Sequence, residues 1–291
     1  MSLRPSRRDL LFGAAAGVGG GWALAADRMS AIEARTGGRL GVAALDMATG
    51  QRLAHRAGER FPMCSTFKVL AVAALLAKVD RGAARLDRFI AYGPADLLSY
   101  APVTRAHVGE GGMKLDDLCA AAVEHSDNTA ANLILAQIGG PAGWTAFARA
   151  IGDPISRLDR TEPALNTALP GDGRDSTAPR AMLGDLRAIS VGGVLSAASR
   201  ARLVGWMVDC QTGQARLRAG LPPSWRVGDK TGTGEAGTAN DIAIAFAPGG
   251  PILITSYLTG AERASDAQRD TAHAEVARVV VEAFRGGAGR G

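Results

Sequence analysis

The distribution of hydrophobic positions divides the chain into strand-forming ends and a helical middle. Short apolar-rich runs bounded by turn residues predict two strands near the N-terminus and three near the C-terminus. These runs are Leu40–Asp46, Gln51–Arg56, Trp225–Gly234, Asn240–Ala247 and Ile252–Thr259. A Pro-Gly-Gly-Pro turn separates the last two runs.

Apolar positions spaced three or four residues apart predict helices between and beside these strands. Ser65–Val79 is apolar on nearly every side, so we expect this helix to be central and buried. The other predicted helices are Asp27–Arg35, Leu115–His125, Thr129–Ile138, Pro141–Ile151, Thr177–Ser190, Ser196–Cys210 and Thr271–Phe284.

Strands at both ends around a helical middle predict an α/β fold of the α+β type. We expect a discontinuous domain of antiparallel sheet flanked by helices, formed by residues 26–60 and 209–291. An all-α domain is inserted into it at residues 61–208.

Residues 155–179 form a long segment without a clear hydrophobic period. A loop of this length inside a compact domain is usually functional, and this one carries Glu162 and Asn166. We expect an ion pair between Arg160 and Asp175 to join its two ends.

The first 25 residues have the composition of a signal peptide. A serine and paired arginines at positions 6–8 precede a mostly apolar stretch, and small residues at 23 and 25 suit a signal peptidase. The match around the arginines favours twin-arginine export over the Sec route. We therefore expect cleavage near Ala25 and a periplasmic or secreted mature protein.

Composition and charge narrow the range of partners. The formal net charge of +5 is too mild to indicate a nucleic-acid partner. No second apolar run reaches membrane length, so we expect no membrane span in the mature chain. The three cysteines are odd in number and fit no metal-site spacing. We expect no metal, no cofactor and a monomer.

Four separated segments supply complementary groups for acyl transfer. They are Ser65-Thr66-Phe67-Lys68, Ser126-Asp127-Asn128, Glu162-Pro163-Ala164-Leu165-Asn166 and Lys230-Thr231-Gly232. Each is a weak signal alone. Together they provide a nucleophile, a neighbouring lysine, a proton shuttle, a carboxylate base and a cationic anchor, which is nearly everything that hydrolysis of an amide requires.

The first segment places a nucleophile and a lysine on one helix. We expect Ser65 at the N-terminus of the buried helix, where unpaired backbone N–H groups favour negative charge. Lys68 lies on the same helix face, and lysine, unlike arginine, can lose its proton in a buried site. The chain contains only four lysines. The backbone N–H of Ser65, with a second donor from the strand at 230–233, can stabilise an oxyanion.

The other segments have structural as well as functional interpretations. Ser-Asp-Asn is also typical of a helix cap, and Lys-Thr-Gly of a solvated strand. In the functional interpretation, Ser126 passes a proton to the leaving nitrogen and Asn128 binds a substrate amide. Gly232 lets a substrate lie against the backbone, while Lys230 and Thr231 bind a carboxylate.

The order and spacing of these segments resemble those of class A serine β-lactamases. The resemblance extends over essentially the whole mature chain, with residues 157–172 similar to the family's Ω-loop and 228–232 similar to its active-site strand. The motifs of other hydrolases, Gly-x-Ser-x-Gly and His-Glu-x-x-His, do not occur. The implied function is hydrolysis of β-lactam antibiotics through a serine acyl-enzyme, and hence β-lactam resistance.

The resemblance implies a role for each reacting group. Ser65 is acylated by the β-lactam carbonyl, and either Lys68 or Glu162, through water, accepts its proton. Ser126 protonates the lactam nitrogen. Glu162, with Asn166, holds and activates the deacylating water.

It also implies positions that bind the substrate. The backbone amides of the nucleophile and Thr233 form the oxyanion hole, Tyr100 lies at the mouth of the cleft, and Arg216 helps to bind the substrate carboxylate. Cys64 precedes the nucleophile as in family carbapenemases, but the position of its bridging partner is Gly234, so that disulfide is absent.

Two alternatives share part of the pattern. A D-Ala-D-Ala carboxypeptidase would use the same serine and lysines but would lack a loop carboxylate for deacylation, and Glu162 with Asn166 argues against it. A β-lactam sensor domain needs coupling to the membrane, for which the sequence offers no span or linker. The sequence does not rank penicillins, cephalosporins and carbapenems as substrates.

Overall fold

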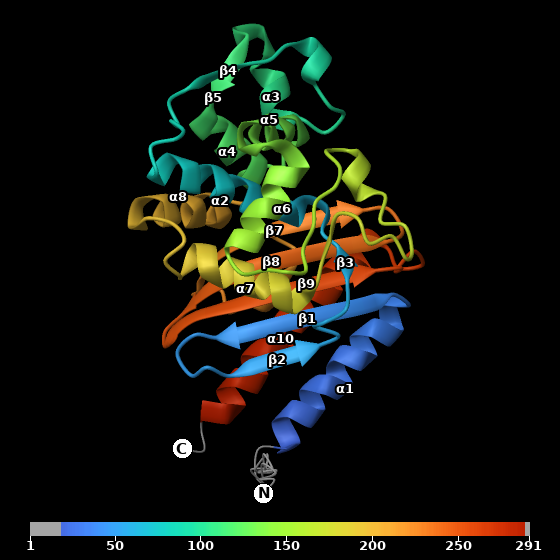
Figure 1. The fold of residues 1–291 in the computed structure, drawn as a ribbon. Coiled ribbons are helices and arrows are strands. Elements are labelled where there is room, and N and C mark those ends of the chain that lie inside the picture. Colours follow the sequence, from blue (N-terminus) through green and yellow to red (C-terminus); the bar gives the residue numbers. More distant parts are fainter. Residues whose placement is uncertain (1–18, 289–291) are drawn as a thin grey trace, which may run out of the picture.

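A five-stranded antiparallel sheet is the centre of the computed structural model, which describes residues 19–288 (Figure 1). The strand order β2-β1-β9-β8-β7 joins strands from both ends of the chain, as predicted. The strands are β1 (Arg39–Asp46), β2 (Arg52–His55), β7 (Arg226–Gly234), β8 (Thr238–Ala247) and β9 (Gly250–Thr259).

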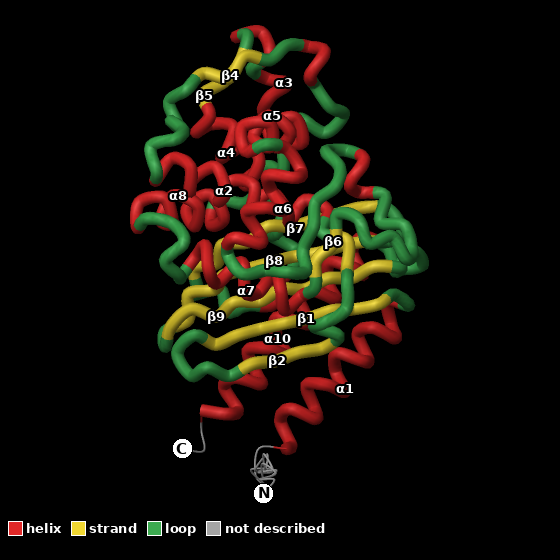
Figure 2. Tube along the Cα trace, in the orientation of Figure 1, coloured by secondary structure: helices red, strands yellow, loops and turns green. Residues whose placement is uncertain are grey.

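Helices cover both faces of the sheet, and a further group of helices extends beyond one of them (Figures 1 and 2). The helices are α1 (Gly19–Thr36), α2 (Phe67–Asp80), α3 (Pro102–Ala106), α4 (Leu115–Glu124), α5 (Asn128–Ile138), α6 (Gly140–Ala150), α7 (Pro179–Ser190), α8 (Ala197–Val208), α9 (Leu217–Gly220) and α10 (Asp266–Ala288). The mixed α+β fold with a helical part is therefore confirmed.

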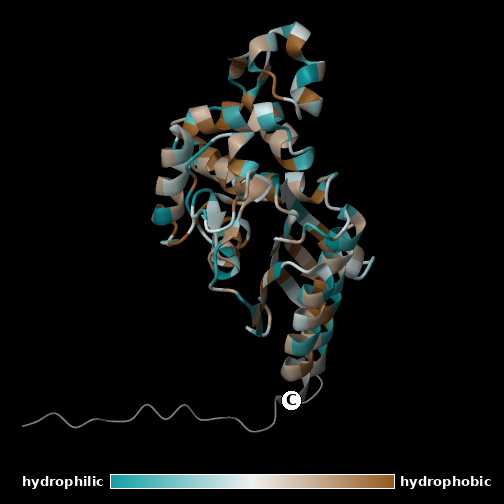
Figure 3. Cartoon of the chain, turned by 90° about the vertical axis from the view of Figure 1, so that its right-hand side faces the viewer, coloured by the Kyte–Doolittle hydropathy of each residue, from teal (hydrophilic) through white to brown (hydrophobic). Residues whose placement is uncertain are grey.

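Alternation along the strands divides the core into two clusters. In β1, Val42 packs with α1 and α10, whereas its neighbour Ala43 packs on the opposite face. In β8, Ala243 and Ile242 divide in the same way, as the two-residue period of a strand requires. Helices beside the C-terminus carry both hydrophobic and hydrophilic residues, as expected of amphipathic helices that cover a sheet (Figure 3).

The part predicted to be purely helical also contains short strands and 3-10 turns. The strands are β3 (Phe61–Pro62), β4 (Phe89–Ala91), β5 (Gly112–Lys114) and β6 (Ser176–Thr177), and the turns are η1 (Cys64–Thr66), η2 (Pro94–Asp96), η3 (Val108–Glu110) and η4 (Ala164–Asn166). Strand β3 pairs with β6, which attaches the segment before α2 to the end of the long loop. Segments of two or three residues are too short to carry a recognisable period.

Most of the expected signal peptide, up to residue 18, lies outside the described residues. Residues 19–25 belong to α1, and Ala25 is buried in the same cluster as Met29 and Ile32 of that helix. Cleavage near Ala25 therefore remains a prediction. Between residues 19 and 288, no helix is both long enough and apolar enough to span a membrane.

Candidate active site

Ser65 lies in the turn η1 directly before α2, rather than in the first turn of that helix as predicted. The residue is 9% exposed. Its hydroxyl donates to Glu162 Oε1 at 3.2 Å, which is its one side-chain hydrogen bond among the described residues. The candidate nucleophile and the loop carboxylate therefore share one site although 97 positions separate them in the sequence.

Lys68 follows on α2 with its side chain completely buried. Its ammonium lies 3.0 Å from Glu162 Oε1, and it donates to Asn128 Oδ1 at 2.6 Å and to the Ser126 carbonyl at 2.7 Å. Burial lowers the pKa of Lys68, and the Glu162 carboxylate opposes this shift. Lys68 therefore gives up its proton more readily than a surface lysine does.

The hydroxyl of Ser126 lies between two buried lysines. Lys230 Nζ donates to it at 3.0 Å and Lys68 Nζ at 3.3 Å. Lys230 also donates to the carbonyl of Thr231 at 2.9 Å, and burial lowers the pKa of Lys230 to about 8. Two ammonium groups beside one hydroxyl favour release of its proton.

The side chain of Asp127 joins the start of α5 to α3. Its buried carboxylate caps α5 by accepting from the N–H of Ala130 at 2.9 Å, and it accepts from both the N–H and the hydroxyl of Thr104 in α3 at 2.9 Å. The helix cap that the Ser-Asp-Asn segment predicts is therefore present. The cap also sets the backbone that presents Ser126, whose φ of 58° lies in the left-handed region.

The neighbouring Asn128 and Tyr100 differ in exposure. The N–H of Asn128 donates to the carbonyl of Tyr100 at 3.1 Å. Because the Oδ1 atom of Asn128 accepts from Lys68, its Nδ2 group is left as a donor. Tyr100 is 51% exposed, so its ring is available for contact from outside.

Glu162 is held by two asparagines. Asn132 of α5 donates to its carbonyl at 2.9 Å and accepts from its N–H at 3.0 Å, so both backbone groups of Glu162 are attached to one side chain. Asn166 Nδ2 donates to Glu162 Oε2 at 2.5 Å. Asn166 Oδ1 is buried and has no hydrogen-bond partner among the described residues, so it remains an acceptor.

The loop of residues 155–178 closes on Asp175. Arg160 Nε lies 2.5 Å from Asp175 Oδ2, which confirms the predicted ion pair. The backbone N–H groups of Asp159 and Arg160 donate to the other carboxylate oxygen at 2.7 and 2.9 Å. The two ends of the loop are therefore joined by a buried carboxylate with several donors.

Strand β7 passes directly against the turn that carries the candidate nucleophile. A Cβ atom at Gly232 would lie 2.8 Å from the Met63 carbonyl and 3.2 Å from the Ser65 nitrogen, so only glycine permits this approach. The next residue, Thr233, is exposed, whereas Thr231 is buried and its hydroxyl lies 2.6 Å from that of Thr212.

Arg216 lies against the same strand. It forms an ion pair with Asp270 at 2.7 Å and donates to the carbonyls of Gly232 at 2.9 Å and Asn240 at 2.8 Å. A further hydrogen bond of 2.9 Å reaches the Thr233 hydroxyl. The guanidinium is therefore held at the edge of the site by four partners.

Comparison with known proteins accords with this geometry. A family model described as the β-lactamase enzyme family matches residues 24–284. The fold also matches a solved structure of an ancestral class A β-lactamase, with a TM-score of 0.87, 58% sequence identity, and coverage of 89% of this chain and 100% of that one.

The chain belongs to the class A serine β-lactamases.

Individual β-lactamases resemble it over most of their length. The β-lactamase CTX-M-8 of Citrobacter amalonaticus is 47% identical over 258 residues, which span 88% of each chain. The β-lactamase AST-1 of Nocardia asteroides is 50% identical over 264 residues, which span 90% of this chain and 84% of that one.

In this class A β-lactamase, one hydrogen-bonded network contains the candidate site residues. Contacts link Ser65, Glu162, Lys68, Ser126 and Lys230 in turn. The remaining candidates join through side-chain or backbone bonds to these residues, to one another or to β7, and they are Tyr100, Asn128, Asn166, Arg216, Thr231, Gly232 and Thr233.

The sequence interpretation did not single out Asn132, although it positions Glu162 in this β-lactamase. An asparagine in a helix interior is unfavourable unless its side chain has a partner, so its place within α5 was an available signal. Cys64, Cys119 and Cys210 are free and buried, as the absence of a partner cysteine at Gly234 requires for the first of them.

Proposed function

We propose that this chain hydrolyses the amide bond of β-lactam antibiotics through an acyl-enzyme on Ser65, and so confers β-lactam resistance. The observation that carries the proposal is the direct contact of the Ser65 hydroxyl with Glu162, itself in contact with Lys68. A nucleophile in contact with a buried carboxylate, which is itself paired with a buried lysine, suits both formation and hydrolysis of an ester.

Acylation begins with attack of Ser65 Oγ on the lactam carbonyl. Its proton passes to Lys68 or, through water, to Glu162. Glu162 Oε1 contacts both the Ser65 hydroxyl and the Lys68 ammonium. The new C–O bond leaves negative charge on the carbonyl oxygen, which the backbone N–H groups of Ser65 and Thr233 stabilise. Each such donor is worth about 3–4 kcal/mol.

Collapse of the tetrahedral intermediate breaks the C–N bond. Ser126 gives its proton to the leaving nitrogen, and Lys68 or Lys230 replaces that proton because both ammonium groups lie within 3.3 Å of the hydroxyl. The opened ring remains attached to Ser65 as an ester.

Deacylation depends on Glu162 and Asn166. The Glu162 carboxylate takes a proton from a water, and Asn166 Nδ2 holds that carboxylate in place by donating to its Oε2 atom. Attack of this water on the ester carbonyl releases the product acid and returns the proton to Ser65. A D-Ala-D-Ala carboxypeptidase would lack this loop carboxylate.

Substrate recognition divides between two sides of the site. Lys230, Thr231, the Thr233 hydroxyl and Arg216 bind the substrate carboxylate beside Gly232. Asn128 Nδ2 binds the amide of the substrate side chain, and the exposed ring of Tyr100 lies at the mouth of the cleft.

We further propose that the protein acts as a monomer outside the cytoplasm, after twin-arginine export and cleavage near Ala25. The export and the cleavage rest on the N-terminal sequence. N-terminal sequencing of the exported protein should begin near residue 26, and light scattering should give the mass of one chain. Retention of residues 1–25 in the periplasmic fraction would contradict the cleavage.

The test of the function is turnover of a chromogenic cephalosporin by purified protein. We expect multiple turnovers that disappear in Ser65→Ala. In Glu162→Ala we expect the acyl-enzyme to accumulate, as a mass increase equal to the bound drug. A stoichiometric burst without turnover in the unmodified protein would instead indicate a penicillin-binding peptidase or a sensor.

A further inference from the structure

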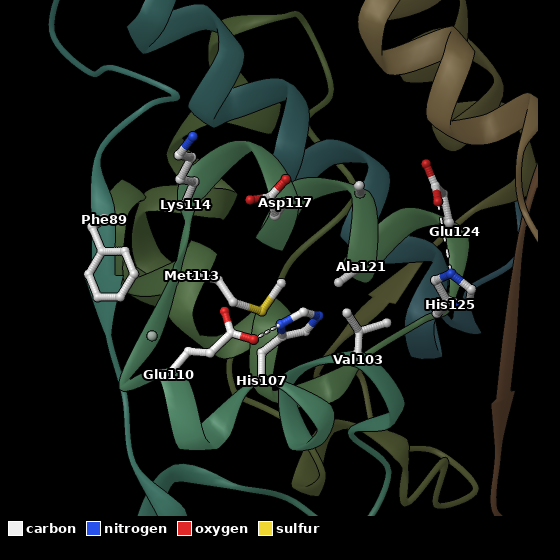
Figure 4. A pocket seen from close by; sticks show the side chains of 12 residues that line it. Phe89, Val103, His107, Glu110, Met113, Lys114, Asp117, Ala121, Glu124 and His125 are labelled. Carbon is white, nitrogen blue, oxygen red and sulfur yellow. Dashed lines mark hydrogen bonds and ion pairs between the residues drawn. The ribbon is translucent and has the colours of Figure 1, made fainter.

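A pocket of about 500 Å³ opens in the helical part of the molecule, between α3, β5 and α4. Figure 4 shows its side chains on opposite sides of an apolar floor, with Met113, Val103 and Ala121 in the middle. Its volume suits a small organic ligand. None of the residues assigned to the reaction lines it.

Carboxylates outnumber cationic groups around this pocket. Glu110, Asp117 and Glu124 line it, with Lys114 as the one lysine or arginine in the lining. His107 Nδ1 lies 2.7 Å from Glu110, so that carboxylate already has a partner. The pocket is therefore acidic although the whole chain carries a net positive charge.

Glu124 is the carboxylate with the least compensation for its burial. Its side chain is 22% exposed, and its one ionic contact among the described residues is His125 at 3.9 Å. Burial raises the pKa of Glu124, and the charge of Asp209 raises it further. A cation beside Glu124 would stabilise its charged carboxylate and so offset both the burial and the repulsion from Asp209.

We propose that this pocket binds a small organic cation with an apolar body. The ammonium or guanidinium group lies against Glu124, and the apolar body covers Val103, Met113 and Ala121. Phe89, which is 56% exposed, lies at the end of the pocket opposite Glu124. The described residues contain no cluster of three ligands that suits a metal ion instead.

Occupancy alters turnover because the walls of the pocket are bonded to the Ser126–Asp127 segment. The carbonyl of Ala121 accepts from the N–H groups of His125 at 3.2 Å and Asp127 at 3.1 Å. The N–H of Val103 donates to the Asp127 carboxylate at 3.0 Å. A ligand inserted between α3 and α4 therefore changes both hydrogen bonds that hold Asp127, one to Ala121 and one to Val103. Binding itself is independent of β-lactam hydrolysis, whereas the effect on turnover rests on the proposed function.

The binding test compares 2-phenylethylammonium with the neutral isostere 2-phenylethanol. Titration of protein labelled at methionine methyl groups should shift the Met113 signal, with the ammonium at least tenfold tighter than the alcohol. Glu124→Gln should remove that difference, while the matched control Glu262→Gln, at an exposed glutamate that does not line the pocket, should keep it.

Equal affinity for the two probes, or an unchanged preference in Glu124→Gln, would overturn the binding site. The coupling is tested separately with a chromogenic cephalosporin at saturating ammonium probe. We expect kcat to fall several-fold in the unmodified protein and to be unaffected in Glu124→Gln. A shift of the Met113 signal without any change of kcat would overturn the proposed coupling, while the proposed binding site would stand.

Discussion

Asp185 is a buried carboxyl group that the proposed reaction does not use. Burial, and then the charge of neighbouring Asp153, raise the pKa of Asp185 to about 9, while Arg149 acts weakly in the opposite direction. Burial by itself would also raise the pKa of Asp153, but hydrogen bonds from Ser156 and Ile155 outweigh this effect, so the pKa of Asp153 is lowered. Asp185 therefore carries a proton at neutral pH and Asp153 does not.

This pair makes stability depend on pH. An acid whose pKa is raised in the folded state holds a proton that the unfolded chain releases, so it costs stability progressively as pH rises from about 4 to about 9, by about 1.4 kcal/mol per pH unit. Asp185→Asn keeps a donor without the ionisable group. We expect it to raise the Tm relative to the unmodified protein at pH 8, with the difference shrinking toward pH 5.

Thermal unfolding across that pH range checks this expectation. Asp27→Asn, at an exposed aspartate without a hydrogen-bond partner among the described residues, is the matched control. The same pH dependence in both variants would show that Asp185 is not the source.

At the scale of elements, the 155–178 loop is positioned by α5 on one side and by the end of β7 on the other. Asn132 of α5 binds both backbone groups of Glu162, and the N–H of Glu235 donates to the Asn166 carbonyl at 2.9 Å. The placement of the deacylating groups is therefore set by contacts from two other elements.

Asn132→Ala removes both bonds to Glu162. Misplacement of a catalytic group by about 1 Å can cost roughly a hundredfold in rate. We expect deacylation to slow by about 10- to 100-fold, with acylation affected less, so that rapid quenching and mass spectrometry detect an accumulated acyl-enzyme. Gln137→Ala, at the other end of α5, should leave both rates close to those of the unmodified protein.

Gly234→Ala tests the contact with β7. An added Cβ would lie 2.6 Å from Cys64 Sγ and 2.7 Å from the Asn166 carbonyl, so the loop or the turn has to move. Overpacking of this kind costs about 1–3 kcal/mol. We expect a lower Tm and roughly tenfold slower deacylation, whereas Gly205→Ala, which meets nothing within 4 Å on α8, should not slow it.

The sequence predicted the main strands and most of the long helices within a few residues, because each carries several periods of its hydrophobic pattern. It placed the start of α1 at Asp27 instead of Gly19 and made α10 too short at both ends. It also identified Arg160 with Asp175, since a polar pair at the ends of an aperiodic loop has few other interpretations. It did not predict that Ser65 lies in a separate 3-10 turn. That turn is fixed by the passage of Gly232 beside it, a contact between distant segments that no local pattern records.

At the scale of the whole molecule, the sheet separates two hydrophobic clusters, and only one of them supports the candidate active site. The cluster that contains α1 and α10 lies on the face away from Ser65, and Met29 is completely buried in it. The opposite cluster contains the residues of α2 that support the candidate nucleophile. Stability and activity should therefore respond independently to substitutions in the first cluster.

Met29→Ala tests this separation. We expect a loss of about 2–5 kcal/mol in the free energy of unfolding, with kcat unchanged at temperatures where the protein stays folded. Ser30→Ala, on the exposed side of the same helix, should change stability by no more than about 0.5 kcal/mol. Denaturant titration and steady-state kinetics on the same samples check both. A large fall in kcat in folded Met29→Ala would contradict the separation.

The pairing of β1 with β9 also governs when the chain can fold. One edge of β1 pairs with β2, and the other edge pairs with β9, which ends at Thr259. A two-stranded hairpin such as β1–β2 is by itself only marginally stable in water. The first strands to leave the ribosome therefore stay unpaired at one edge until β9 has also been made. The sheet therefore closes only after residues 250–259 have been made, and a nascent chain that stops before residue 250 leaves that edge open to other molecules.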